Sequence, residues 1–158
     1  MGCDIHCYVE FQEPNDGNHW RAFGGHINPG RSYRTFYRMA GVRGDYSNIH
    51  PITEPRGVPS DLAYEAHDDN WLYVSDPPEK GECMRETADS YVQWGSKYLD
   101  EKRQYVSHPD WHSHSWLTPE EFGQCLEYAH PEYKALLAAM KSLEASGYVV
   151  RLVFWFDN

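Results

Sequence analysis

The two most strand-like segments of the chain lie at its two ends, and this limits the folds that the chain can adopt. Residues 3–11 alternate strictly between apolar and polar side chains, which is typical of a strand with one buried face. Residues 148–156, YVVRLVFWF, are nearly all β-branched or aromatic and indicate a buried strand. If the two strands are antiparallel neighbours, Asp157 lies beside Asp4 and His6.

The chain between these strands shows helical spacing interrupted by Gly and Pro. We predict a second strand over 19–23, helices over 31–42, 61–67, 84–102, 118–128 and 131–147, and loops over 43–59 and 70–81. The helix that begins after Thr118 has the clearest start, because Thr118 and Glu121 can form a capping box. The prediction is an α+β fold with a small, mainly antiparallel sheet that includes the N- and C-terminal strands, and with helices packed on one side. A chain of 158 residues suits a single domain over 1–158.

The charge and composition exclude several classes of protein. A net charge of -10 argues against binding to bulk nucleic acid or to an anionic membrane, because that affinity comes from Lys and Arg. No apolar run is long enough to span a membrane. Aromatic residues make up 15% of the chain, so rings either line a pocket or an interface, or fill the core. With four cysteines, no CxxC and no secretion signal, we expect free thiols in a reducing cytoplasm.

Two separate segments carry Asp and His side chains suited to a metal. Asp4 and His6 are two apart in the N-terminal strand, and Asp110, His112 and His114 are two apart in the sequence DWHSHSW. Residues two apart in an extended chain point to the same side, so we expect each segment to present its side chains as one group. Imidazole and carboxylate suit zinc or manganese, with Asp4, His6 and His112 as candidate ligands. The alternatives are a solvated strand face and a His-rich surface loop.

The second segment also offers groups for acid–base chemistry. The candidate catalytic residues are Asp110, His112, Ser113 and His114. Ser113 would be a nucleophile beside a histidine, although no GxSxG motif accompanies it. Ser115 and Trp116 directly precede a helix start, whose N–H groups favour an anion, so both are candidate ligand-binding residues.

Arginine is concentrated in one part of this acidic chain. Arg31, Arg34, Arg38, Arg43 and Arg56 fall within 26 positions, with Tyr33, Phe36, Tyr37 and Tyr46 among them. Guanidinium groups bind phosphate through paired hydrogen bonds, and aromatic rings can stack a base. We therefore expect Arg43 and Arg56 to clamp phosphate and Tyr37 to contact the ligand. The alternative is a solvated helix face paired with local acids.

Several longer stretches together resemble a known family. They are MGCDIHCYVE at 1–10, FYRMAGVRG at 36–44, PITEPRGVPSD at 51–61, HSHSWLTPEEF at 112–122 and RLVFWFDN at 151–158. With these motifs the chain resembles a family of small proteins encoded by bacteriophages and prophages, over both ends and most of the middle. Its unusual polar positions are Asp4, His6, Arg43, Arg56, Asp61, His112, Ser113 and Ser115. The resemblance adds Asp61 to the ligand-binding candidates, and Met39 stands where an aliphatic residue is more usual.

The resemblance implies a phage accessory protein in the cytoplasm of a bacterial host cell. Such proteins often counter host defences that signal with cyclic nucleotides or ADP-ribose derivatives, which is an argument by analogy. The leading hypothesis is metal-assisted hydrolysis of a phosphodiester in a small, nucleotide-like phosphorylated ligand. One alternative is a non-catalytic sponge that sequesters the same ligand, in a pocket that a homo-oligomer could form between its subunits. A second is an acidic protein inhibitor of a host protein.

Overall fold

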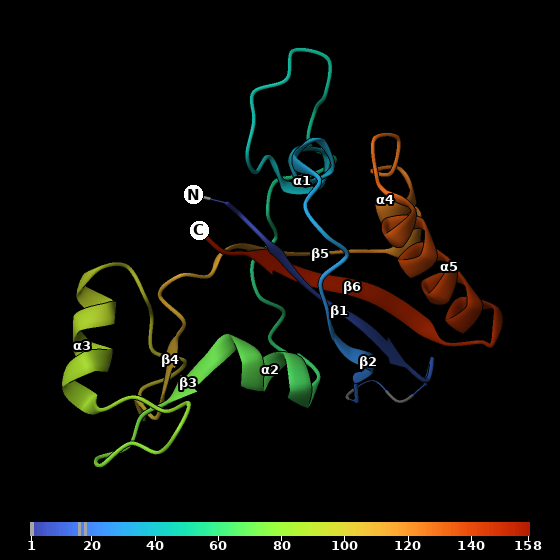
Figure 1. Ribbon diagram of the computed structural model, residues 1–158. Helices are drawn as coiled ribbons and strands as arrows, with labels where there is room; N and C mark the ends of the chain where they lie inside the picture. Colours follow the sequence, from blue (N-terminus) through green and yellow to red (C-terminus); the bar gives the residue numbers. More distant parts are fainter. Residues whose placement is uncertain (1, 16, 18) are drawn as a thin grey trace. The chain divides into compact units, whose positions relative to one another are not determined.

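A computed structural model describes residues 2–15, 17 and 19–158 of the chain (Figure 1). Contacts between residues divide it into two compact units. One unit is His67–Trp111, and the rest of the chain forms the other. The organisation as a single domain stays a prediction.

The larger unit is built on a four-stranded antiparallel sheet. Its strands are β1 (Ile5–Gln12), β2 (Arg21–Ile27), β5 (His112–Leu117) and β6 (Val149–Phe156), in the order β2-β1-β6-β5. The two end strands are therefore central, as the sequence predicts. They pair along their full length, with Ile5 opposite Phe156 and Gln12 opposite Val149. The α+β fold with a sheet that includes both terminal strands is confirmed.

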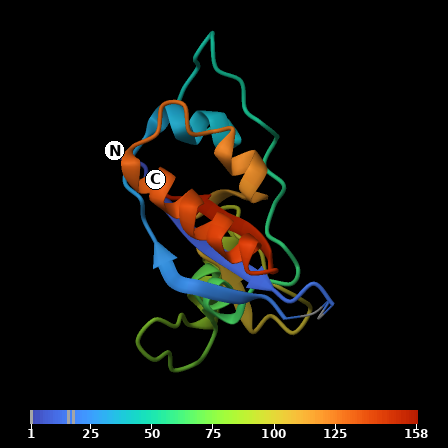
Figure 2. The ribbon, with the colours of Figure 1, turned by 90° about the vertical axis from the view of Figure 1, so that its right-hand side faces the viewer.

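Three helices pack on one face of this sheet and enclose the main core. They are α1 (Tyr33–Ala40), α4 (Pro119–Gly123) and α5 (Pro131–Ala145), and Figure 2 shows the unit from the side of α4 and α5. The core joins apolar residues of the strands to those of the helices, including Cys7, Leu152, Phe154, Phe36, Phe122 and Met140. The predicted capping box is present at α4, where Thr118 and Glu121 exchange side chain-to-backbone hydrogen bonds.

The second face of the sheet is polar and aromatic, and it contains a buried ion pair. Glu10 is fully buried, and its carboxylate accepts hydrogen bonds from Arg151 Nε and from the Ala63 N–H, both at 2.7 Å. Burial raises the pKa of Glu10, and the neighbouring Arg151 opposes the rise. Arg151 also donates to Asp61 Oδ1 at 3.0 Å and lies 3.9 Å from the centre of the Trp20 ring. Asp61 therefore belongs to this structural network.

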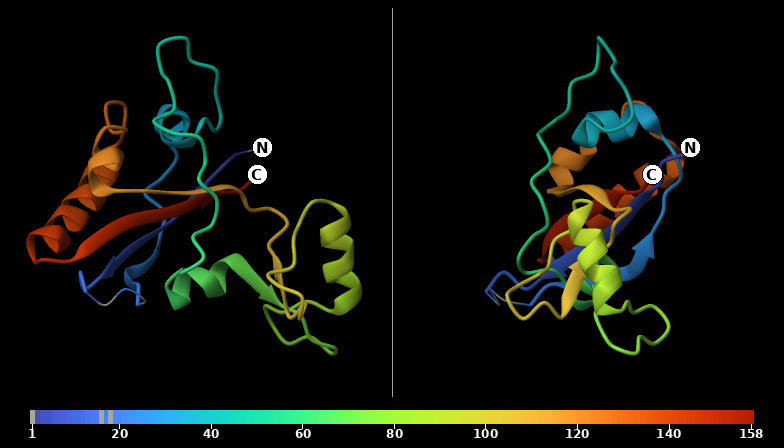
Figure 3. Two further views of the ribbon diagram at one scale, coloured as in Figure 1. Left: turned by 180° about the vertical axis from the view of Figure 1, so that it is seen from behind. Right: turned by 90° about the vertical axis from the view of Figure 1, so that its left-hand side faces the viewer.

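The smaller unit has its own small sheet and core (Figure 3). It contains β3 (Trp71–Tyr73), β4 (Tyr105–Ser107) and α3 (Arg85–Gln93), and α2 (Tyr64–Asn70) leads into it. Its core is formed by Val74, Cys83, Ala88 and Val106. The helix predicted over 84–102 ends at Gln93, because Gly95 adopts φ +118°, which a helix cannot contain. The loop predicted over 70–81 begins with β3, where aromatic residues favour a strand.

Removal of one partner from the buried ion pair should destabilise the larger unit. We expect Glu10→Ala to lower the free energy of unfolding by about 3–5 kcal/mol. The reason is that Arg151 stays buried but loses Glu10, the more buried of its two carboxylate partners. Urea unfolding followed by tryptophan fluorescence measures the change. Glu13→Ala, at an exposed position just after β1, is the matched control and should change the free energy by less than about 0.5 kcal/mol. A similar small change for both variants would contradict the structural role of Glu10.

Candidate functional site

The end of β6 places a carboxylate beside the first histidine of the chain. Asp157 Oδ2 lies 2.8 Å from His6 Nε2, and Asp157 Oδ1 accepts a hydrogen bond of 2.8 Å from the Asp4 N–H. The Asp157 N–H in turn donates to the Asp4 carbonyl at 3.1 Å. The pairing of β1 with β6 thus fixes this carboxylate, as the adjacency of the two end strands predicts.

A second histidine from β2 completes a line of three side chains. His26 Nε2 lies 2.7 Å from His6 Nδ1. Gly24 and Gly25 adopt φ of +77° and +69°, and the register of β2 against β1 shifts between Cys7 and Val9. This bulge brings His26 next to His6. The strand predicted over 19–23 stops short of His26, and the Gly-Gly pair is the signal that could have indicated the bulge.

The line Asp157–His6–His26 can bind a metal or transfer a proton. The carboxylate accepts from one ring nitrogen of His6, which fixes the ring orientation and leaves the lone pair on the other nitrogen. That other nitrogen, Nδ1, faces His26 at a distance at which the two imidazoles share a proton. The same two nitrogens, His6 Nδ1 and His26 Nε2, could be the first two ligands of a divalent cation.

Trp155 is the centre of the aromatic group around this line. Its ring is nearly parallel to those of His6, Tyr8 and His114, with centroids 6.2, 5.7 and 5.6 Å away. Trp155 is fully buried, and its indole N–H has no hydrogen-bond acceptor among the residues that the structure describes. A buried N–H without an acceptor costs about 1–3 kcal/mol.

His114 is held in its neutral form. Burial lowers the pKa of its imidazole to about 4, and the nearby His112 adds to the shift. His114 is therefore uncharged at neutral pH. Its neutral ring has one N–H donor and one nitrogen that can accept a hydrogen bond. Its stacking on Trp155 places it on the same face of the sheet as His6.

His112 lies on the opposite face of the sheet from His114. Its ring stacks on Phe156 with centroids 6.1 Å apart, whereas His114 stacks on Trp155, the preceding residue of β6. The expectation that His112 and His114 point to one side is thus wrong. The reason is that Ser113 adopts φ +53° and that the register of β5 shifts between His112 and Ser115.

The two Asp/His segments meet through Asp157. His112 Nε2 lies 3.4 Å from the Asp157 carbonyl oxygen, and His6 contacts the carboxylate of the same residue. His112 Nδ1 lies 2.9 Å from Ser113 Oγ, so the two candidate catalytic residues contact each other. Asp110 belongs to the smaller unit, where its N–H donates to His108 Nδ1 at 3.2 Å.

Asp4 has a cationic partner of its own. Both of its carboxylate oxygens accept hydrogen bonds from Arg31, at 2.7 and 3.0 Å, and this contact lowers the pKa of Asp4. The three predicted metal ligands all contact Asp157, but their side chains have different further partners: Arg31 for Asp4, His26 for His6 and Ser113 for His112. Of these, only His6 has a second imidazole within hydrogen-bond distance of its ring among the described residues.

The predicted ligand-binding residues around Arg56 form a structural cluster. Arg56 binds the carboxylate of Glu121 through two hydrogen bonds, which lowers the pKa of Glu121 to about 2, and its guanidinium lies 4.5 Å from the Trp116 ring centre. Ser115 is fully buried, and its hydroxyl accepts from the Arg56 N–H at 3.0 Å. Arg43 instead lies near Cys3 and 6.0 Å from the Tyr33 ring centre, so the described contacts of Arg43 and Arg56 do not form one clamp.

The low pKa of His114 should make stability fall on mild acidification. The folded protein keeps His114 neutral down to about pH 4, while the unfolded chain takes up the proton below its usual pKa of 6.5. Stability is thus complete above about pH 6.5 and is lost as the pH falls toward 4. Between pH 7 and pH 5 we expect the wild type to lose about 2 kcal/mol more than His114→Gln in urea unfolding. His50→Gln, at an exposed position, is the control that should follow the wild type; equal losses in all three proteins would refute the prediction.

Comparison of the chain with protein-family models, with curated proteins and with solved structures finds no match. None of the helices in the described part of the chain combines the length and apolar character needed to cross a bilayer.

Proposed function

We propose that the protein is a metal-dependent phosphodiesterase that acts on a small, nucleotide-like phosphorylated ligand in the cytoplasm of a bacterial host cell. The observation that carries the proposal is the line of Asp157, His6 and His26, with contacts of 2.8 and 2.7 Å. His6 and His26 would hold a zinc or manganese ion, and Asp157 would orient His6.

The geometry of the two imidazoles fits a single cation after a small movement. Two nitrogens bound to one tetrahedral zinc at their usual bond lengths lie about 3.3 Å apart. His6 Nδ1 and His26 Nε2 are 2.7 Å apart, so a displacement of about half an ångström opens the pair for the ion. His26 is exposed on β2, which gives its ring the freedom to move. The other coordination positions would be available to water and to a phosphoryl oxygen.

The neighbouring side chains supply the other requirements of phosphodiester hydrolysis. A bound divalent ion polarises a phosphoryl oxygen and lowers the pKa of water. Asp157 accepts the proton on His6 Nε2 and so keeps Nδ1 available as a ligand. Arg31 and Arg43, which contact the consecutive residues Asp4 and Cys3, bring positive charge to the start of β1.

Sequestration without hydrolysis is the second candidate, favoured by the contact between His6 and His26 themselves. Two imidazoles 2.7 Å apart already share a proton without any ion. The same residues can then bind a phosphorylated ligand through hydrogen bonds and release it unchanged. A homo-oligomer and the inhibition of a host protein by the acidic surface stay as proposals.

Removal of either histidine should abolish metal binding. We expect isothermal titration calorimetry to show zinc or manganese binding by the wild type, none by His6→Ala or His26→Ala, and binding about 10–100-fold weaker for Asp157→Asn, because the oriented ring loses its carboxylate. His19→Ala, which removes an exposed histidine just before β2, is the matched control and should bind like the wild type. If His26→Ala kept the wild-type affinity for the metal, the proposed metal site would be contradicted.

Turnover should depend on the same two histidines. The purified protein would be incubated with a panel of cyclic dinucleotides and ADP-ribose derivatives, with manganese, with zinc and with chelator, and chromatography would follow each nucleotide before and after heat denaturation. Loss of one nucleotide only with metal, abolished in His26→Ala, is the expected result. A nucleotide that is depleted and then released intact on heating would establish sequestration. No change in any nucleotide would contradict both and would favour a protein partner.

A further inference from the structure

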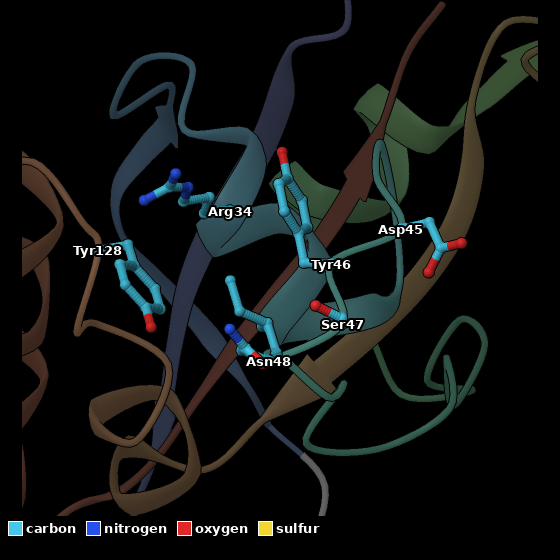
Figure 4. Close-up of a pocket in the computed structure, with 7 residues that line it drawn as sticks. Arg34, Asp45, Tyr46, Ser47, Asn48 and Tyr128 are labelled. Atoms are coloured by element: carbon cyan, nitrogen blue, oxygen red, sulfur yellow. The ribbon is translucent and has the colours of Figure 1, made fainter.

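Two adjoining cavities lie beside α1, on a part of the larger unit that the His6 site does not include. The first has a volume of about 290 Å³ and is lined by residues that include Arg34, Asp45, Tyr46 and Tyr128 (Figure 4). The second has a volume of about 270 Å³ and is lined by residues that include Arg38, His50 and Glu127. Asn48, Ile49 and Tyr128 line both cavities, so the two adjoin each other along these residues, and the pair is named the hollow.

The hollow contains two arginines that form no ion pair with a carboxylate of the described residues. Arg34 and Arg38 are four residues apart on α1 and so lie on the same side of the helix. Neither forms an ion pair with any described residue, whereas Arg31 is paired with Asp4. The Arg34 guanidinium lies 5.5 Å from the Tyr128 ring centre, and Arg38 Nη1 donates to the His50 carbonyl at 2.6 Å.

This arrangement has a cost in the protein without a ligand. Like charges four residues apart on a helix are destabilising by a few tenths of a kcal/mol. In a chain of net charge -10, acidic side chains are plentiful, yet none neutralises Arg34 or Arg38 among the residues described. An anion bound between the two guanidinium groups would remove their repulsion and would accept several hydrogen bonds from them.

Two tyrosine rings provide flat surfaces next to these charges. In Figure 4 the side chains of Arg34 and Tyr128 lie on one side of the cavity and Tyr46 on the other, while the Asp45 carboxylate points away from Arg34 and Tyr128. The Tyr46 ring makes an edge-to-face contact with the Tyr37 ring, and the two centroids are 5.4 Å apart. Tyr128 is 37% exposed, so its ring is accessible for stacking. Aromatic faces of this kind stack a nucleobase.

We propose that the hollow is a binding site for a nucleotide that carries at least two phosphate groups. The phosphates bind Arg34 and Arg38, and the base lies against Tyr128. Each cavity alone is at the lower limit of the volumes of ligand pockets, so a nucleoside diphosphate requires both. The Glu127 carboxylate and the Asn48 amide supply acceptors for the hydroxyls of the sugar. This inference does not rest on hydrolysis at His6 and His26, because it uses none of those residues.

Calorimetric titration with ADP, AMP, adenosine and pyrophosphate, in buffer that contains chelator, tests the site. We expect ADP to bind at least about tenfold more tightly than AMP, and Arg34→Gln or Arg38→Gln each to weaken ADP about tenfold or more, since each loses charge-assisted hydrogen bonds. Tyr128→Leu should weaken ADP and leave pyrophosphate unchanged. Arg21→Gln is the matched control, because Arg21 also lacks an ion pair among the described residues, lies over the Phe11 ring and lines neither cavity.

The outcomes separate this site from the proposed hydrolase. His26→Ala should bind ADP like the wild type, and loss of ADP binding in that variant would overturn the assignment of a separate site. Equal ADP affinity in the wild type, Arg34→Gln and Arg38→Gln, or no binding of ADP by the wild type, would also overturn it. If Arg34→Gln fails to fold, Arg34→Lys preserves the charge and removes the guanidinium fork, and it should still weaken ADP.

Discussion

The pairing of β1 with β6 is the interaction on which the larger unit depends. Eight residues of each strand are in antiparallel register, and both outer strands are attached to this pair, β2 to β1 and β5 to β6. A shift of register by one residue would exchange the two faces of a strand. The core residues Cys7 and Phe154 would then take the places of His6 and Trp155. One constraint thus determines both where the helices pack and which side chains form the candidate site.

The elements set by local sequence were the ones that could be predicted. Strict alternation identified β1, the apolar run identified β6, and their adjacency placed Asp157 beside His6. The capping box at Thr118 likewise needs only the residues of one turn. The prediction missed features that depend on a bulge. His26 reaches His6 through the two glycines before it, and Ser113 turns His112 away from His114. A bulge depends on how the partner strand pairs, which residue periodicity does not encode.

The arginines of the larger unit differ in whether a carboxylate neutralises them. Arg151 and Arg56 are fixed by carboxylates that they neutralise, and each also packs against a tryptophan. Arg34 and Arg38 line a hollow, and neither forms an ion pair with a carboxylate among the described residues. The sequence showed that arginines are concentrated in this part of the chain, but it could not show which of them are neutralised. The three-dimensional contacts therefore favour Arg34 and Arg38 of α1, and not Arg56, as the candidate phosphate-binding arginines.

The separation of β1 and β6 along the chain also determines when the candidate site can form. About 140 residues separate Gln12 from its partner Val149, and a ribosome needs about 10–30 s to add them. During that time β2 can cover one edge of β1 as a hairpin, while the other edge has no strand to pair with. His6 and His26 are therefore together early in synthesis, and Asp157 joins them last. Until β6 is made, the nascent chain carries the candidate metal-binding pair beside an open strand edge, where pairing with a second nascent chain competes with correct folding.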